Sequence, residues 1–140
     1  MAQQTLTDSF ILWLAQSLAS QKESLYIAIG AGLPSWDSEG LPSVAPDVSG
    51  LVDQKSIKPV SRIAYLTDQE QVSPDPTPIL QFTSSMFFAE DYEGSVRECG
   101  LFSYDREADR YTLILYSVFS RLDITPQVSL TKNLIINLAL

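Results

Sequence analysis

The sequence predicts a mainly β domain, an antiparallel sandwich or open barrel of about six strands, with one N-terminal helix and a long proline-rich arm. Short segments of alternating apolar and polar residues follow one another, separated by proline-, glycine- or charge-rich breaks. After the N-terminal helix no segment is long enough for a crossover helix, which excludes a βαβ arrangement. We expect the helix within residues 1–22 and a single β domain over 23–140, with the arm at 31–59.

The N-terminal segment has the capping residues and the periodicity of a helix. Thr7 or Asp8 supplies a cap. The residues that fall on one helical face are Phe10, Ile11, Leu14, Ala15 and Leu18. Leu12 and Trp13 widen this apolar stripe beyond what a surface helix needs. Two alternatives follow: the helix packs on its own domain, or it docks on a neighbouring subunit.

A long irregular connection follows the first predicted strand, Leu25–Gly30. Residues 33–59 contain four prolines and two glycines, so little regular structure is expected there. The connection nevertheless carries the apolar residues Trp36, Leu41, Val44, Leu51 and Val52. We therefore interpret it as an ordered arm and not as a free linker.

The remaining strands are predicted at 60–66, 79–90, 96–102, 111–119 and from 128 to the end of the chain. Residues 111–119 are apolar on both faces, which predicts a buried strand. Residues 105–110 form a charged hairpin loop. The sets that share one face are Leu80, Phe82, Met86 and Phe88, and then Val128, Leu130, Leu134, Ile136, Leu138 and Leu140.

Composition limits the classes of partner. Seventeen acidic and nine basic residues give a formal net charge of −8, which argues against nucleic acid and fits a partner with a basic patch. One cysteine cannot form an intrachain disulfide, and the sequence shows neither a signal-like segment nor an apolar run of membrane length. We expect synthesis in the cytoplasm and no membrane insertion.

Candidate catalytic groups are few. The absence of histidine removes the usual general base and most metal sites, and Cys99 has no base to activate it. Acidic residues gather at 90–93 and 105–109, in turn-like stretches where carboxylates are normally solvated. We expect no catalytic residue, no cofactor, no bound metal and no enzymatic activity. Trp36, Tyr92 and Tyr104 could stack on sugars, which keeps a carbohydrate-binding module as an alternative.

One motif stands out, Arg97-Glu98-Cys99-Gly100-Leu101-Phe102. A glycine within a strand marks a bulge or a close backbone approach. An adjacent charge pair that enters a buried strand must be hydrogen-bonded or paired, because unpaired burial is costly. We therefore predict that one of Arg97 and Glu98 is buried or half-buried and paired across strands.

The order of these motifs resembles a known family. Upstream of the Arg-Glu-x-Gly-Leu-Phe segment lies the strand Tyr26-Ile27-Ala28-Ile29-Gly30, followed by a loop with Pro34 and Trp36. Over residues 24–140 this order is similar to that of phage tail-collar fibre proteins and wedge subunits of contractile-tail baseplates.

The resemblance implies a structural subunit of the baseplate of a phage virion, or of a phage-like contractile injection system. Such a subunit would bridge wedge proteins and tail fibres and would be oligomeric within the particle. The alternative is a receptor- or carbohydrate-binding module of a tail fibre. We expect the partner surfaces to be the helix and the arm, at Phe10, Leu12, Trp13, Trp36, Leu41, Val44, Leu51 and Val52.

Overall fold

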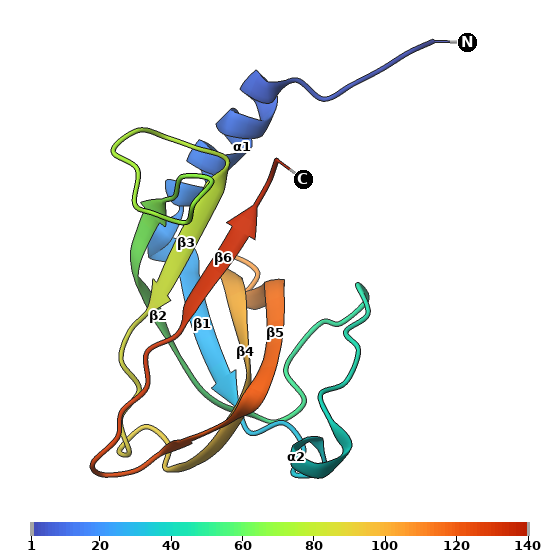
Figure 1. Ribbon diagram of the computed structural model, residues 1–140. Coiled ribbons are helices and arrows are strands. Elements are labelled where there is room, and N and C mark those ends of the chain that lie inside the picture. Colours follow the sequence, from blue (N-terminus) through green and yellow to red (C-terminus); the bar gives the residue numbers. More distant parts are fainter. Residues whose placement is uncertain (1, 140) are drawn as a thin grey trace.

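The computed structural model describes residues 2–139. It contains one long helix, one short helix and six strands (Figure 1). In chain order these are α1 (Asp8–Ala19), a 3₁₀ turn (Lys22–Ser24), β1 (Leu25–Gly30), α2 (Trp36–Glu39), β2 (Gln54–Tyr65), β3 (Ile79–Ser84), β4 (Gly94–Asp105), β5 (Arg110–Ile124) and β6 (Asn133–Asn137).

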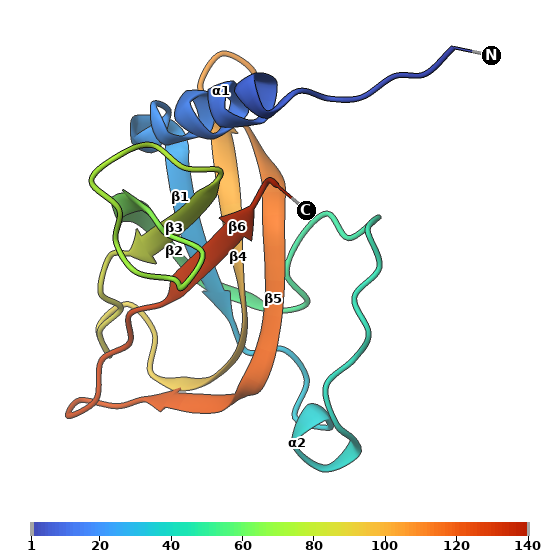
Figure 2. The same cartoon turned by 45° about the horizontal axis from the view of Figure 1, so that its top comes forward.

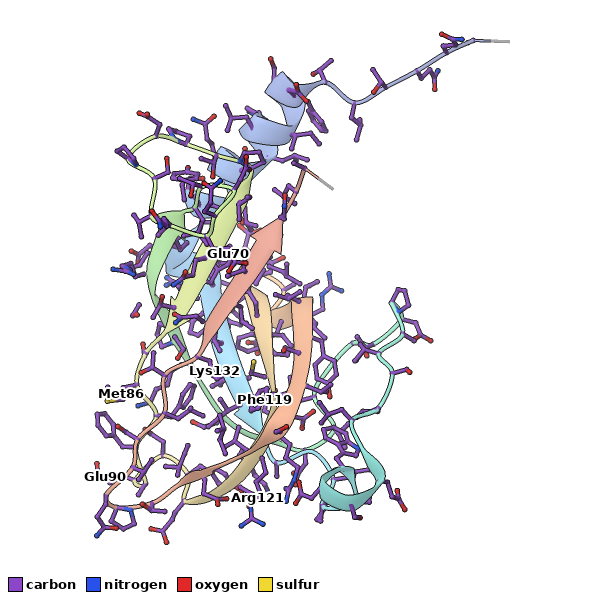
Figure 3. All side chains as sticks on the ribbon, viewed as in Figure 1. Glu70, Met86, Glu90, Phe119, Arg121 and Lys132 are labelled. Atoms are coloured by element: carbon purple, nitrogen blue, oxygen red, sulfur yellow. The ribbon has the colours of Figure 1, made fainter. Side chains whose placement is uncertain are left out.

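The six strands form one antiparallel sheet in the order β5-β4-β1-β2-β3-β6. The sheet curls so that β6 returns towards β5, and the result is a nearly closed barrel (Figure 1). Just before β6, the Lys132 ammonium lies 3.8 Å from the centre of the Phe119 ring of β5, so a cation–π contact links the two edges (Figure 3). The predicted mainly β, open-barrel class with one N-terminal helix is confirmed.

Helix α1 closes one end of the barrel. The Thr7 hydroxyl accepts a hydrogen bond from the Phe10 amide at 3.2 Å, which fixes the start of the helix as predicted. Ala15 is fully buried in the core, and Leu18 packs against it. Figure 2 shows α1 lying across the top of the barrel. The main face of α1 therefore packs on its own domain.

Several predicted strand bounds were wrong. Strand β5 runs to Ile124 and not to 119, β6 begins at Asn133 and not at 128, and two further differences concern β2 and β3. Strand β2 begins at Gln54, six residues before the predicted start. The β1–β2 ladder extends that far because Gly30 pairs with Gln54. The irregular arm is therefore residues 31–53. Strand β3 ends at Ser84, so the predicted common face fails beyond it: Phe87 is fully buried, whereas Met86 and Phe88 are each 46% exposed.

Strand β5 was predicted to be buried, but it is an edge strand that pairs only with β4. Its apolar residues divide between the core, which Leu115 and Phe119 contact, and the outside, where Ile114 is exposed. At the end of the chain Leu134 is buried as predicted, but Val128 is exposed. Leu140 lies outside the described residues.

Candidate interaction surface: the anchored arm and the N-terminal helix

The arm is the connection between the hydrogen-bonded strands β1 and β2. Its two ends lie side by side, because the Ala31 amide donates to the Asp53 carbonyl at 2.9 Å. Between these ends the chain leaves the barrel, forms the four-residue helix α2 and returns (Figure 1). The sequence motif at 97–98 lies where the two ends meet.

Glu98 holds both ends of the arm. Its side chain is fully buried, and its carboxylate accepts hydrogen bonds from the backbone amides of Gly32 (3.1 Å), Val52 (2.8 Å) and Asp53 (2.8 Å). The Tyr116 hydroxyl of β5 donates a fourth bond at 2.6 Å. No cation forms an ion pair with Glu98 in residues 2–139, so backbone amides and a phenol satisfy the oxygens of this buried carboxyl group.

Arg97 holds the start of the arm. Its guanidinium donates two hydrogen bonds to the Asp37 carboxylate of α2, at 2.9 and 2.7 Å, and one to the Ala31 carbonyl at 2.9 Å. This bidentate geometry is the strong form of an arginine–carboxylate pair. The prediction that one of Arg97 and Glu98 is buried or half-buried and paired across strands is confirmed by Glu98, which is buried and accepts a hydrogen bond from Tyr116 of β5. Arg97 is buried as well, but it binds the arm and not a neighbouring strand.

A β-bulge explains how two neighbouring residues both reach the arm. In a regular strand they would point to opposite faces of the sheet. Here Val96 pairs with Leu122 and Glu98 pairs with Val118, so the register shifts at Arg97. The local bend redirects both charged side chains towards the arm.

Small residues let the arm approach the sheet. A Cβ atom at Gly100 would lie 2.9 Å from Leu51 and 2.8 Å from Leu113, and one at Gly30 would lie 2.4 Å from the Glu98 carboxylate. Gly100 therefore marks a close approach, one of the two alternatives that its place in the motif suggests. The two other residues of the motif, Leu101 and Phe102, are buried.

These contacts shift the pKa values of the groups near the arm. The hydrogen bonds from Arg97 lower the pKa of Asp37 below its usual value. The hydrogen bond to Asp37 in turn raises the pKa of Arg97. Burial, followed by the bond to Glu98, raises the pKa of Tyr116, so its hydroxyl stays protonated and remains a donor at neutral pH.

The predicted arm residues divide into two groups. Trp36 is 8% exposed, and its ring lies against Gly32, whose positive φ of 62° places the backbone close to the indole. Leu51 is half-buried over Gly100. The exposed members, here called the arm surface, are Leu33, Leu41, Val44 and Val52. Leu33 was not among the predicted arm residues.

The helix exposes a second group. Phe10 and Trp13 are 41% and 58% exposed, and their rings stack with centres 5.8 Å apart. Leu6, one turn before Phe10, is 69% exposed. We call Leu6, Phe10 and Trp13 the α1 surface. Leu12 is half-buried.

A third group was not anticipated, because we expected no partner surface on the sheet faces. Tyr26, Phe102, Tyr104 and Tyr111 form an aromatic cluster on β1, β4 and β5, with ring centres 4.6–6.2 Å apart. Tyr111 is 44% exposed. Tyr26 is far in sequence from the other three, and the β4–β5 register brings Tyr104 opposite Tyr111.

The remaining candidates take structural roles. Cys99 is fully buried, and burial raises the pKa of its thiol to about 11. Tyr92 donates a hydrogen bond to the Ser95 carbonyl, and Asp91 pairs with Lys58 at 2.6 Å. Within residues 2–139 no cluster of three or more acidic, cysteine or histidine side chains could hold a metal ion. Over the same residues no helix is both long and apolar enough to span a membrane.

The fold and these surfaces define a small β domain whose conspicuous features are exposed apolar groups. Residues 1–106 match the family model described as baseplate wedge 3 tail fiber network component. The chain belongs to this family. A search of curated proteins finds no match. The resemblance to baseplate wedge subunits is confirmed, and a structural role in the phage tail baseplate follows.

Proposed function

We propose that this chain bridges a wedge protein and a tail-fibre protein in the baseplate, with the α1 surface contacting one neighbour and the arm surface the other. One observation carries the proposal: α1 lies across one end of the barrel, whereas the arm runs along its side next to β5, so the two surfaces belong to different parts of the molecule (Figures 1 and 2). Exposed apolar groups of this kind mark interaction sites. A component with two separated contact surfaces can join two neighbours.

The barrel that carries both surfaces is well suited to this role. The core contacts of Ala15 and Leu18 fix α1 to the barrel, and Arg97 and Glu98 fix the arm. Both surfaces are therefore ordered before binding, which lowers the entropic cost of assembly. In this role the chain acts through its surfaces and not as a catalyst.

The test uses one substitution on each surface. Trp13→Ala removes the aromatic anchor of the α1 surface, and Leu41→Ser removes an exposed leucine of the arm surface. Loss of an anchor costs about 2 kcal/mol, roughly thirtyfold in affinity. We expect each variant to lose a different neighbour in co-sedimentation with baseplate intermediates. Gln16→Ala, an exposed polar position on the same helix, is the matched control.

The outcomes are distinct because circular dichroism checks the fold of each variant. Folded variants that both assemble normally would contradict the placement of the surfaces. Variants that lose the same neighbour would contradict a bridge, because both surfaces would then serve one contact.

A second candidate function is carbohydrate binding at the aromatic cluster. The observation that favours it is the exposed Tyr111 ring, 4.6 Å from Tyr104, beside the polar β4–β5 turn. Exposed tyrosine rings are common stacking platforms for sugars. Titration with host cell-wall oligosaccharides, followed by nuclear magnetic resonance, tests it: shifts confined to the cluster support binding, and unchanged spectra at millimolar sugar contradict it.

A further inference from the structure

A groove runs between the arm and the outer face of β5. Two adjoining cavities, of about 360 and 310 Å³, share the arm residues Val44, Ala45 and Val48 and the β5 residue Tyr116. The first also contacts Leu113–Leu115, and the second extends to Leu33 and Val52. We call this the arm–β5 groove. Its walls are mainly apolar, and the whole of it lies on described residues.

The aromatic cluster lies next to the groove along β5. Leu113 pairs with Phe102, whose ring centre lies 6.1 Å from that of Tyr111. From Tyr111 to Tyr116 an extended strand spans roughly 17 Å. An apolar track of this length and shape fits an extended segment of about five or six residues.

The charge of the residues around the groove indicates which kind of partner it binds. Residues 31–53 contain four acidic residues and neither lysine nor arginine. Asp37 pairs with Arg97 and Asp53 with Lys55, whereas Asp47, which lies between the groove residues Pro46 and Val48, forms no ion pair in residues 2–139. The rim is therefore negative. A second copy of this chain, with its own net charge of −8, is disfavoured.

We propose that the arm–β5 groove receives an extended apolar segment, flanked by lysine or arginine, from a different protein. Leucine, valine or proline side chains fill the two cavities, and the basic flanks face Asp47. The inference rests on the proposed bridging role, because it names the chemistry of the neighbour that contacts the arm. It adds that one sheet face is part of the contact.

The test uses a synthetic peptide and the purified chain. The peptide has a core of about six leucine, valine and proline residues between two lysine pairs, and the matched peptide replaces the lysines with glutamates. We expect the basic peptide to bind with a Kd below about 1 mM and to shift the resonances of Val44, Val48 and Tyr116. The acidic peptide should bind at least tenfold more weakly, and added salt should reduce the difference.

Variants locate the binding. Val44→Asp and Ile114→Asp place a charge on opposite walls of the groove, at exposed positions that do not support the core. Each should weaken binding of the basic peptide at least tenfold. Asp47→Asn should weaken it two- to fivefold, as expected for a surface charge pair. Val128→Asp, at an exposed position outside the groove, is the control and should bind as the parent does.

Three results would overturn the proposal: no binding of the basic peptide, equal binding of both peptides, or equal binding to the parent and the two groove variants. Concentration-dependent dimers that Val44→Asp abolishes would assign the groove to a second copy instead. These measurements need no baseplate, so they separate the groove from the bridging role. If the peptide does not bind, the bridging role is still tested independently by Trp13→Ala and Leu41→Ser.

Discussion

Helix α1 and the arm both present apolar side chains to solvent, but they are held to the barrel by different forces. Helix α1 is held by burial of Ala15 and by the packing of Leu18, as an amphipathic helix usually is. The arm is held mainly by polar contacts, from Arg97 and Glu98 to its two ends. The arm therefore keeps most of its apolar residues available.

The difference shows two ways to make an ordered surface. A helix can expose only the residues that its 3.6-residue period leaves outside. An irregular segment has no such restriction, but it needs hydrogen-bond partners for its backbone, which a buried carboxylate can supply. We therefore expect that replacing the polar residues Arg97 and Glu98 weakens the attachment of the arm and leaves α1 in place. The attachment of α1 should respond only to changes on its buried face.

The largest effect is expected from Glu98→Ala. It leaves the amides of Gly32, Val52 and Asp53 without their acceptor in a buried site. We expect the free energy of unfolding to fall by about 3–5 kcal/mol in urea denaturation. Glu107→Ala, in the exposed β4–β5 turn, should change it by no more than about 0.5 kcal/mol. Equal effects at the two positions would show that Glu98 does not anchor the arm.

A smaller effect is expected from Arg97→Ala, which frees only the start of the arm. The Asp37 carboxylate reaches solvent on its own, so the expected loss is about 2 kcal/mol. We expect Trp36 to leave its buried site together with Asp37, so the fluorescence of Trp36 should shift to longer wavelength. A Trp13→Phe background removes the emission of the other tryptophan. An unshifted emission spectrum would mean that the arm holds its position without Arg97.

Acid should loosen the arm before it affects α1. The folded-state pKa of Asp37 is lowered, so this residue contributes stability above its unfolded pKa of about 3.9, and the contribution is lost as pH falls through the lowered folded pKa. Asp37→Asn has no such dependence. The stability difference between parent and variant should be constant above pH of about 5 and should shrink below 4. A difference that is undiminished at pH 2 would contradict the ion pair.

The smallest effect on stability is expected from Trp13→Ala. More than half of this side chain is already exposed, and its main contact is the stacked Phe10 ring. The free energy of unfolding should change by about 0.5 kcal/mol or less. A loss above 2 kcal/mol would place Trp13 in the core and remove it from the α1 surface.

Much of the fold followed from local patterns. The helix cap at Thr7, the bounds of β1 and the hairpin near 105–110 depend on residues close in sequence, and the structure reproduces them. The prediction that β5 is buried was wrong. A strand that is apolar on both faces can also lie at the edge of a sheet when another segment covers part of its outer face, as the arm does here. The prediction that Met86 and Phe88 share a face with Leu80 and Phe82 was wrong because β3 ends at Ser84. The alternation of apolar and polar residues does not show where a strand ends.

The candidate surface was only partly accessible to sequence reasoning. The motif at 97–98 indicated buried charges, but its partners in the arm lie some 45–66 positions away and no spacing rule connects them. Trp36 lies in the same proline-rich segment as Leu41 and Val44, yet its ring is buried against Gly32, four residues earlier. The aromatic cluster depends on strand register, which a single sequence does not fix.

The most direct test of the account is amide hydrogen exchange of the arm in the parent chain and in Glu98→Gln. The account predicts that the Val52 and Asp53 amides are protected in the parent, because they donate to the buried carboxylate, and that the neutral amide side chain weakens this protection at least tenfold. Amides of α1 should be unchanged. Parent Val52 and Asp53 amides that exchange as fast as an unfolded peptide would contradict the account.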